Sequence, residues 1–467
     1  MVAKKEKINF TEGKLLPQIV LFVLPIVATN LLQMLYNAAD MMVVSLSPEK
    51  NAVGAVGVTG SFIHLIVNLF IGFSIGANVI VARHIGANDE AKVQSAVHTA
   101  ILTSLFFGIF GAGIGILLTK PVLQAMGITG KLLDLASTYT YIYFSGVPFL
   151  ALTNCLGAIF RAKGDAKTPL VVLTITGLIN VVLNFIFVIF LKMSVEGVSL
   201  ATMIANAVSF VVLLIKLSRD KDATAFSFKK LRIDKKSFWD ILSVGLPAGI
   251  GSSLFALSNI LIQSSIVSVN NAVCPPGSEF EPIVNGSSAA GNIEGFIYTA
   301  MNAVAQGAIT FTSQNMGAEK PERIKPILYN CYLLVTLLGL VTGGMVLLLK
   351  NPLLSLYGVK GGAEGSLESL ALEAATVRMW FICLPYFLCG LMDVTAGVLR
   401  GFGRSLLSTG ISLVGSCLLR IVWLATVFKA FPTLETIFVC YPITWTLTAL
   451  VGHIAIYMLL GRMKKGY

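Results

Sequence analysis

Four polar side chains fall on one face of the first long apolar stretch of the chain. Asn30, Gln33, Asn37 and Asp40 are spaced by three, four and three residues, at which helical side chains share a face. An ionisable side chain inside a membrane span costs about 2.5–3.5 kcal/mol on insertion scales, so Asp40 is a functional candidate. We expect this row to line an aqueous cavity; the structural alternative is hydrogen bonding between helices.

Oxygen-bearing side chains recur in the fifth and sixth apolar stretches. Asn180 and Asn184 are one helical turn apart, and Thr202 adds a hydroxyl. With Asp40 and Asn37 they supply one charge and several oxygens, which suits either a proton site or a hard cation such as Na⁺. We predict a coupling-ion site from these five residues. If the ion is Na⁺, its ligands are Asp40, Asn180, Asn184 and Thr202.

The second half of the chain carries its membrane acids elsewhere. Glu294 and Asp393 are candidates for binding cationic cargo or a second proton. The structural alternatives are an interfacial position for Glu294 and an ion pair of Asp393 with Arg420 or another buried base. We expect Arg378 and Arg420 each to pair with an acid. The predicted substrate cavity comprises Gln33, Tyr36, Asn259, Gln263, Glu294, Tyr298, Met301 and Asp393.

Composition indicates that these side chains are positioned by membrane helices. Hydrophobic residues make up 55% of the chain and charged residues 12%, about half of the usual charged share of a soluble domain. A span needs about 20 apolar residues. We predict twelve spans, at 16–46, 54–82, 92–119, 132–160, 168–191, 196–217, 239–270, 289–315, 326–349, 372–399, 405–428 and 434–461.

Lysine and arginine counts in the connections predict the orientation. With the N-terminus inside, the cytoplasmic segments hold 25 of these residues and the outer connections seven. Positive charge concentrates on the cytoplasmic side. We therefore expect a multi-pass protein of the plasma membrane with both termini in the cytoplasm.

The chain contains an internal duplication. "VLPIVATNLL" around Pro25 is similar to "GLPAGIGSSL" around Pro247, "RHIGANDEAKV" to "QNMGAEKPERI", and "GAIFRAKGDAKTP" to "AGVLRGFGRSLLS". The three pairs occur in the same order at corresponding places. Six spans per half give parallel repeats. We predict an N-terminal lobe at 1–217, a cytoplasmic linker at 218–237 and a C-terminal lobe at 238–467, around a central cavity.

The same segments resemble a known family. "LPIVATNLLQMLYNAADMMVV", "GFSIGANVIVARHIGAND", "FTSQNMGAEKPERI" and "GVLRGFGRS" are similar, in this order, to the multidrug and toxic compound extrusion (MATE) family of prokaryotic transporters. The resemblance implies export of amphipathic, often cationic compounds in exchange for protons or sodium. Some prokaryotic members carry a second carboxylate where this chain has Asn184, which weakens a two-acid coupling scheme.

The leading hypothesis is therefore a cation-coupled antiporter that exports drugs or metabolites by rocking of its lobes. A flippase for lipid-linked oligosaccharides or lipids, from a related group, is the alternative. We expect neither enzymatic activity nor a cofactor beyond the coupling ion, because the chain has no clustered acids such as DDxxD and no metal-ligand spacing among its cysteines. The expected partners are small amphipathic molecules and membrane lipids, without nucleic acid, and we expect a monomer.

Overall fold

Helices account for every predicted span in the computed structural model, which describes residues 10–49, 51–274, 281–363 and 365–464. Within these ranges, ten helices are long and apolar enough to cross a membrane, and the bent pair α11 and α12 makes an eleventh. The remaining predicted span is α8 (Pro282–Gly317), which is 36 residues long and carries a row of polar side chains. The prediction of an all-α integral membrane protein is confirmed.

The chain divides into two compact units by its internal contacts. Unit 1 comprises Met1–Ser253 with Thr310–Lys320, and unit 2 comprises Leu254–Ile309 with Pro321–Tyr467. The helices α7 and α8 each contribute to both units. This division differs from the lobe boundaries inferred from the duplication, which stay a prediction.

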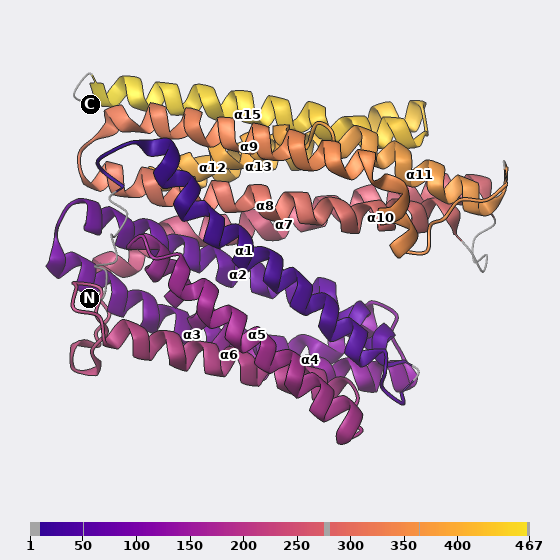
Figure 1. The fold of residues 1–467 in the computed structure, drawn as a ribbon, viewed down its shortest axis with the longest axis horizontal. Coiled ribbons are helices and arrows are strands. Elements are labelled where there is room, and N and C mark those ends of the chain that lie inside the picture. The colour runs from indigo at the N-terminus through magenta and orange to yellow at the C-terminus, as the bar shows by residue number, and fades with distance from the viewer. Residues whose placement is uncertain (1–9, 50, 275–280, 364, 465–467) are drawn as a thin grey trace. The chain divides into compact units, whose positions relative to one another are not determined.

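Unit 1 brings together the helices that carry the predicted ion site. In this unit α4 packs on α2, α3 and α6, while α5 packs on α1 and α6 (Figure 1). The elements are α1 (Leu15–Val44), α2 (Ala52–Gly86), α3 (Glu90–Ala125), α4 (Gly130–Ala162), α5 (Lys167–Phe185) continued by the π-helical turn η1 (Ile186–Phe190), α6 (Val195–Ser218), the short η2 (Phe228–Lys230) and the first part of α7 (Lys235–Val273).

Glycines allow α2 and the first part of α7 to approach closely. A Cβ added at Gly72 would overlap the backbone of Gly249 and Gly245, and one at Gly76 would overlap the Ile241 carbonyl. Small residues permit such backbone contact between membrane helices. This pair of helices is therefore held together inside unit 1 by backbone packing.

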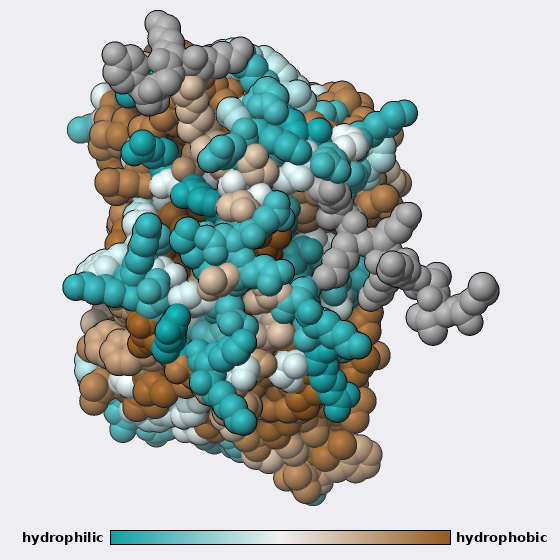
Figure 2. Space-filling model, turned by 90° about the vertical axis from the view of Figure 1, so that its left-hand side faces the viewer, coloured by the Kyte–Doolittle hydropathy of each residue, from teal (hydrophilic) through white to brown (hydrophobic). Residues whose placement is uncertain are grey.

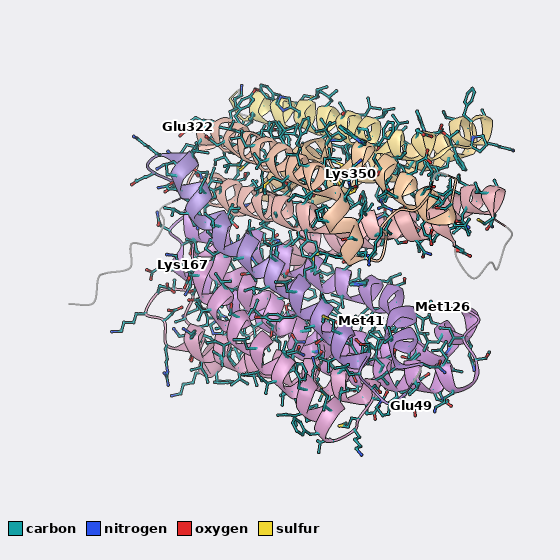
Figure 3. All side chains as sticks on the ribbon, turned by 45° about the vertical axis from the view of Figure 1, so that its right-hand side comes forward. Met41, Glu49, Met126, Lys167, Glu322 and Lys350 are labelled. Atoms are coloured by element: carbon teal, nitrogen blue, oxygen red, sulfur yellow. The ribbon has the colours of Figure 1, made fainter. Side chains whose placement is uncertain are left out.

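Aspartate side chains cap the N-termini of two helices of unit 1, α3 and α7. Asp89 Oδ1 accepts from Lys92 N at 3.1 Å at the start of α3, and Asp234 Oδ2 accepts from Ser237 N at 2.8 Å at the start of α7. The backbone N–H of Ser237 lowers the pKa of the Asp234 carboxyl. Figure 3 shows Lys167, at the start of α5, at the opposite end of unit 1 from Glu49 and Met126.

Unit 2 contains interrupted helices. The tenth predicted span consists of two helices bent by 46°, and Pro385 lies at the break, where proline removes a backbone donor and disfavours helix before it. Two π-helical turns interrupt the eleventh span, and the short α10 was not predicted. Besides the later part of α7 and the first part of α8, the elements are η3 (Pro321–Arg323), α9 (Ile324–Leu348), α10 (Lys350–Leu356), α11 (Leu367–Ile382), α12 (Tyr386–Gly401), α13 (Ser405–Ser412), η4 (Leu413–Leu418), α14 (Leu419–Trp423), η5 (Leu424–Phe428) and α15 (Leu434–Lys464).

Large apolar side chains are exposed along the helices. Phe106, Leu117 and Phe190 are 62%, 77% and 77% exposed, respectively. Figure 2 shows hydrophilic side chains over much of the face on view and hydrophobic side chains at its edges. An apolar exterior along helices whose backbone is internally hydrogen-bonded is what a bilayer requires.

Candidate functional site

The Asp40 carboxylate, near the end of α1, is contacted by side chains from two neighbouring helices. Asn184 Nδ2 on α5 donates to Asp40 Oδ1 at 2.5 Å, and the Thr202 hydroxyl on α6 lies 3.4 Å from Asp40 Oδ2. Asn184 Nδ2 also lies 3.3 Å from Asn180 Oδ1, and Asn180 Nδ2 donates to Thr202 Oγ1 at 3.3 Å. Four of the five residues predicted for the ion site therefore form one network.

This network contains one charge and no counter-charge. No lysine or arginine in the described part of the chain forms an ion pair with Asp40, whose hydrogen-bond partners are the neutral Asn184 and Thr202. Asn184 Oδ1 is buried and accepts no hydrogen bond within the same residues. A carboxylate in such surroundings is stabilised by binding a proton or a cation. The side-chain oxygens present could hold either.

Two tyrosines that sequence reasoning missed lie near this carboxylate. Tyr139 and Tyr143 of α4 are close enough for the charge of Asp40 to act on them, and their rings are 6.0 Å apart. Their spacing of four residues places them on one face of α4. That spacing was the available signal, but aromatic residues at helical spacing are also ordinary core residues.

The other predicted residues of α1 lie outside the network. The side chains of Gln33 and Asn37 are exposed, and Asn37 makes none of the contacts around Asp40. Tyr36 is half-buried and its hydroxyl donates to the Thr174 carbonyl oxygen at 3.1 Å on α5. The ring of Tyr36 occupies the space beside Gly177, where a Cβ would overlap it.

In unit 2, Glu294 of α8 forms an ion pair with Arg378 of α11. Arg378 Nε donates to Glu294 Oε2 at 3.2 Å, Arg378 Nη2 donates to Glu294 Oε1, and Arg378 Nη1 donates to Ser287 Oγ at 2.9 Å. Both side chains are only 12% exposed. The expected pairing of Arg378 with an acid is confirmed, and the charge of Glu294 is balanced within the unit.

Asp393 of α12 is the second candidate acid within the spans of this unit. Asn302 of α8 bonds to its carboxylate, and the charge of Arg400, two turns further along α12, acts on it. Asp393 Oδ2 is buried and has no hydrogen-bond partner among the described residues. Tyr298 of α8 lies within reach of the same charge and is 39% exposed.

Arg420 of α14 was expected to pair with an acid, but its partners in the described ranges are neutral. Its guanidinium donates from Nη1 to Asn259 Oδ1 at 3.3 Å and from Nε to Thr444 Oγ1 at 3.4 Å. The guanidinium also lies over the ring of Tyr441, 4.2 Å from its centroid, and near Phe255 at 5.1 Å. No acid in the described ranges forms an ion pair with it, because amide, hydroxyl and aromatic groups surround it instead. Its Nη2 is buried and has no hydrogen-bond partner in the part of the chain that the structure describes.

The remaining predicted cavity residues are spread through unit 2. Asn259 is exposed and takes part in the Arg420 cluster, while Gln263 one turn further along α7 is half-buried. Met301 is 1% exposed, and its sulfur packs against Gly390 of α12. The structure therefore places Met301 in the core of this unit.

Comparison with known proteins identifies the class of molecule that carries these sites. The fold and the membrane-embedded polar groups define a multi-pass helical transporter. A family model described as MatE matches residues 25–186 and 281–426, more than half of the chain. The chain belongs to the MatE family, which confirms the family that its motifs resemble.

Three relatives illustrate the breadth of the match. The probable multidrug resistance protein YoeA of Bacillus subtilis is 26% identical, over 84% of this chain and 82% of its own. An FAD transporter of Shewanella oneidensis is 22% identical, over 83% of this chain and 82% of its own. The solved structure of a MOP superfamily transporter from Pyrococcus furiosus matches with a TM-score of 0.88 at 20% identity, covering 98% of this chain and 99% of that chain.

Proposed function

We propose that this chain is a cation-coupled antiporter that exports amphipathic drugs or metabolites, and that Asp40 holds the coupling ion. The observation that carries the proposal is a membrane-embedded carboxylate that contacts the neutral side chains of Asn184 and Thr202 and forms no ion pair with a cation in the described ranges. Asn180 bonds to both of these side chains. Curated relatives named as multidrug resistance and export proteins support the export of small molecules.

The coupling follows from the alternation of Asp40 between two charge states. When the carboxylate is free, the hydrogen bond from Asn184 and the hydroxyl of Thr202 stabilise its charge. When it binds a proton or Na⁺, the site becomes neutral. The lobes change between their inward-open and outward-open states only when either the ion or the cargo is bound. Alternating access of the lobes therefore exchanges the ion for the cargo across the membrane.

The coupling ion is a proton or sodium. A proton needs one carboxylate, which Asp40 provides. Sodium needs several oxygens, and the acceptor atoms Asn184 Oδ1, Asn180 Oδ1 and Thr202 Oγ1 could join Asp40 once the amide of Asn184 turns. No further cofactor is required.

For cationic cargo, Asp393 is the better recognition residue of the two candidate acids in the spans of unit 2, Glu294 and Asp393. Glu294 is neutralised by Arg378, whereas Asp393 keeps a buried oxygen without a partner within the described ranges. Tyr298 beside it offers an aromatic face for a cation.

A second candidate function is the export or flipping of molecules that bear an acidic group, including lipid-linked oligosaccharides. Arg420 favours this candidate, because its guanidinium is buried without an acid partner among the described residues. The relative named as an FAD transporter also favours it.

The protein is proposed to work as a monomer in the plasma membrane with both termini in the cytoplasm. The distribution of lysine and arginine between the connections supports this orientation.

The test is efflux of a cationic dye from proteoliposomes under separately imposed proton and sodium gradients. We expect one gradient to drive efflux and Asp40→Asn to abolish the driven component. Asp134→Asn is the matched control, because it makes the same change at an exposed acid near the start of α4. Unchanged driven efflux by Asp40→Asn would refute the coupling role.

A further inference from the structure

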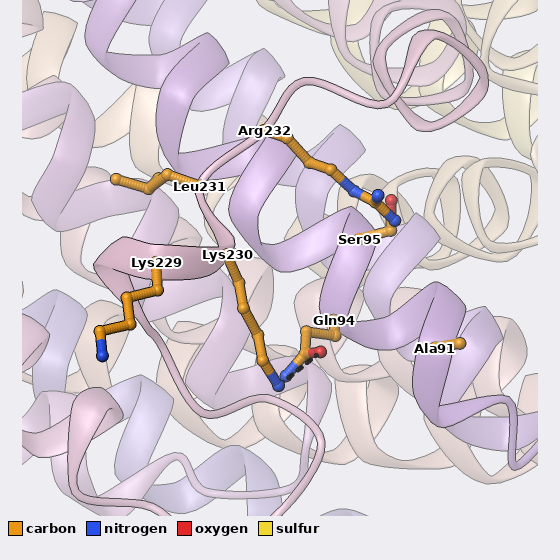
Figure 4. Close-up of a pocket in the computed structure, with 7 residues that line it drawn as sticks. All are labelled: Ala91, Gln94, Ser95, Lys229, Lys230, Leu231 and Arg232. Atoms are coloured by element: carbon orange, nitrogen blue, oxygen red, sulfur yellow. Dashed lines mark hydrogen bonds between the residues drawn. The ribbon is translucent and has the colours of Figure 1, made fainter.

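A basic cavity of unit 1 lies where the linker after α6 crosses the first turns of α3. It has a volume of about 350 Å³ (Figure 4). Three cationic side chains come from the linker, and two side chains able to donate hydrogen bonds come from α3. The lining residues are Ala91, Gln94, Ser95, Lys229, Lys230, Leu231 and Arg232.

His98 of α3 attaches the linker to this helix. Its side chain is 1% exposed. Its Nδ1 lies 2.7 Å from the Gln94 carbonyl oxygen, and its Nε2 accepts from the backbone N–H of Ser227 at 3.1 Å. The imidazole also stacks on Phe226, with ring centroids 5.5 Å apart. The backbone immediately before the cavity is therefore held in place.

Two further contacts hold the linker on α3, one beyond the cavity and one within its lining. The backbone N–H of Asp234 donates to Thr99 Oγ1 at 3.0 Å, and Lys230 Nζ donates to Gln94 Oε1 at 3.1 Å. In Figure 4 the Arg232 side chain extends toward Ser95. The ammonium group of Lys230 is consequently positioned before any ligand binds, which reduces the entropy lost on binding.

No ion pair among the described residues cancels the positive charge of the cavity, and the one nearby acid on which the charge of Arg232 acts is Asp234. Lys229, Lys230 and Arg232 are exposed and form no ion pair with an acid in the described part of the chain. The nearby Asp89 is engaged by Lys92, 2.7 Å away, and Asp234 accepts the bonds that begin α7.

One lining hydroxyl lacks a partner. Ser95 Oγ is buried and forms no hydrogen bond within the described ranges. A phosphate group has acceptor oxygens for this hydroxyl and for the charged groups of Lys230 and Arg232, and arginine and lysine bind phosphate through charge-assisted hydrogen bonds. The chemistry of the cavity therefore fits a phosphate ester.

The apolar neighbours of the cavity favour a lipid as the source of that phosphate. Leu231 lines the cavity, and Phe228, Ile233 and Trp239 beside it are 73%, 57% and 60% exposed. Basic and apolar side chains are thus interspersed from residue 228 to residue 233. Such segments lie in the membrane interface, where cations bind anionic headgroups and apolar side chains contact the lipid.

We propose that the basic cavity formed by the linker and α3 binds the phosphodiester headgroup of an anionic membrane lipid. Lys230 and Arg232 bind the phosphate oxygens, Ser95 donates its hydroxyl, and Phe228 and Ile233 contact the glycerol and acyl region. This site is separate from the Asp40 network and does not depend on the transported molecule.

The test is native mass spectrometry of the full chain in detergent, titrated with phosphatidylglycerol or with phosphatidylcholine of the same acyl chains. We expect the protein to bind phosphatidylglycerol more tightly. Each cation near an anionic surface contributes about fivefold. The double variant Lys230→Gln/Arg232→Gln should therefore bind phosphatidylglycerol about 30-fold more weakly.

The matched control is Lys216→Gln/Lys221→Gln, which removes two exposed charges outside the cavity, one from the last turn of α6 and one from the linker. It should bind like the unaltered chain. Equal loss in both double variants would refute a localised site, as would equal binding of the two lipids. Glycerol 3-phosphate and inorganic phosphate form a further arm: if either competes as strongly as the lipid, the ligand is a soluble phosphate and the lipid assignment is wrong.

Discussion

The ion pair between Glu294 and Arg378 provides a quantitative prediction for unit 2. The change Arg378→Gln removes both donors to the Glu294 carboxylate and the bond from Nη1 to Ser287. It also removes the guanidinium that packs against Gly291. Breaking a buried pair by removing one partner costs about 3–5 kcal/mol. Because each side chain is 12% exposed, we expect the lower end, about 3 kcal/mol.

The double variant Glu294→Gln/Arg378→Gln makes the prediction specific. It leaves no uncompensated charge, so its stability should be within about 1 kcal/mol of the unaltered chain. The assay is equilibrium unfolding in mixed micelles of a mild detergent with increasing sodium dodecyl sulfate. Arg462→Gln, at an exposed arginine near the end of α15, is the control. The reasoning is refuted if Arg378→Gln unfolds like this control, or if the double variant is no more stable than the single one.

Two further predictions concern unit 1. Gly177→Ala should destabilise the chain by about 1–3 kcal/mol, because the added Cβ overlaps the ring of Tyr36 and forces it away from Thr174; unfolding like the unaltered chain would show that the ring moves freely. Asp234→Ala should cost about 1 kcal/mol at neutral pH through loss of the α7 cap. The bond from Ser237 lowers the pKa of the Asp234 carboxyl in the folded chain. The ionised cap therefore stabilises the folded chain fully at pH values above the pKa of the unfolded carboxyl, and this stabilisation is lost as the pH falls through the lowered pKa of the folded state. Unfolding compared from pH 7 to pH 3 checks it, and an increment unchanged at pH 3 would contradict it.

The sequence predicts the helices well because span length and apolar content are local properties. The fifth span shows this: the predicted range 168–191 corresponds to α5 and the turn η1. The break in the tenth span was missed, although Pro385 is visible in the sequence. The reason is that hydropathy over a window of about 20 residues does not register a local change of direction.

The candidate ion site was partly predictable for a similar reason. Asn180 and Asn184 share a face by their spacing, and Asp40 was the only acid available in its span. The partners that a buried side chain finds on a distant helix could not be predicted in this way. Arg378 and Arg420 look alike in the sequence, yet one has an acid partner and the other has amide, hydroxyl and aromatic partners. Only the packing of α8, α11, α14 and α15 distinguishes them.

The most direct test of the central claim measures the ion rather than the cargo. Proteoliposomes that contain the full chain and an internal pH-sensitive dye, or that are supplied with ²²Na⁺, are given a cargo gradient and no ion gradient. An antiporter must move the ion against the cargo, because the coupling of the two fluxes is reciprocal. We predict counter-movement of one ion, lost in Asp40→Asn and retained in Asp134→Asn. Cargo movement without any proton or sodium movement in the unaltered chain would contradict the account.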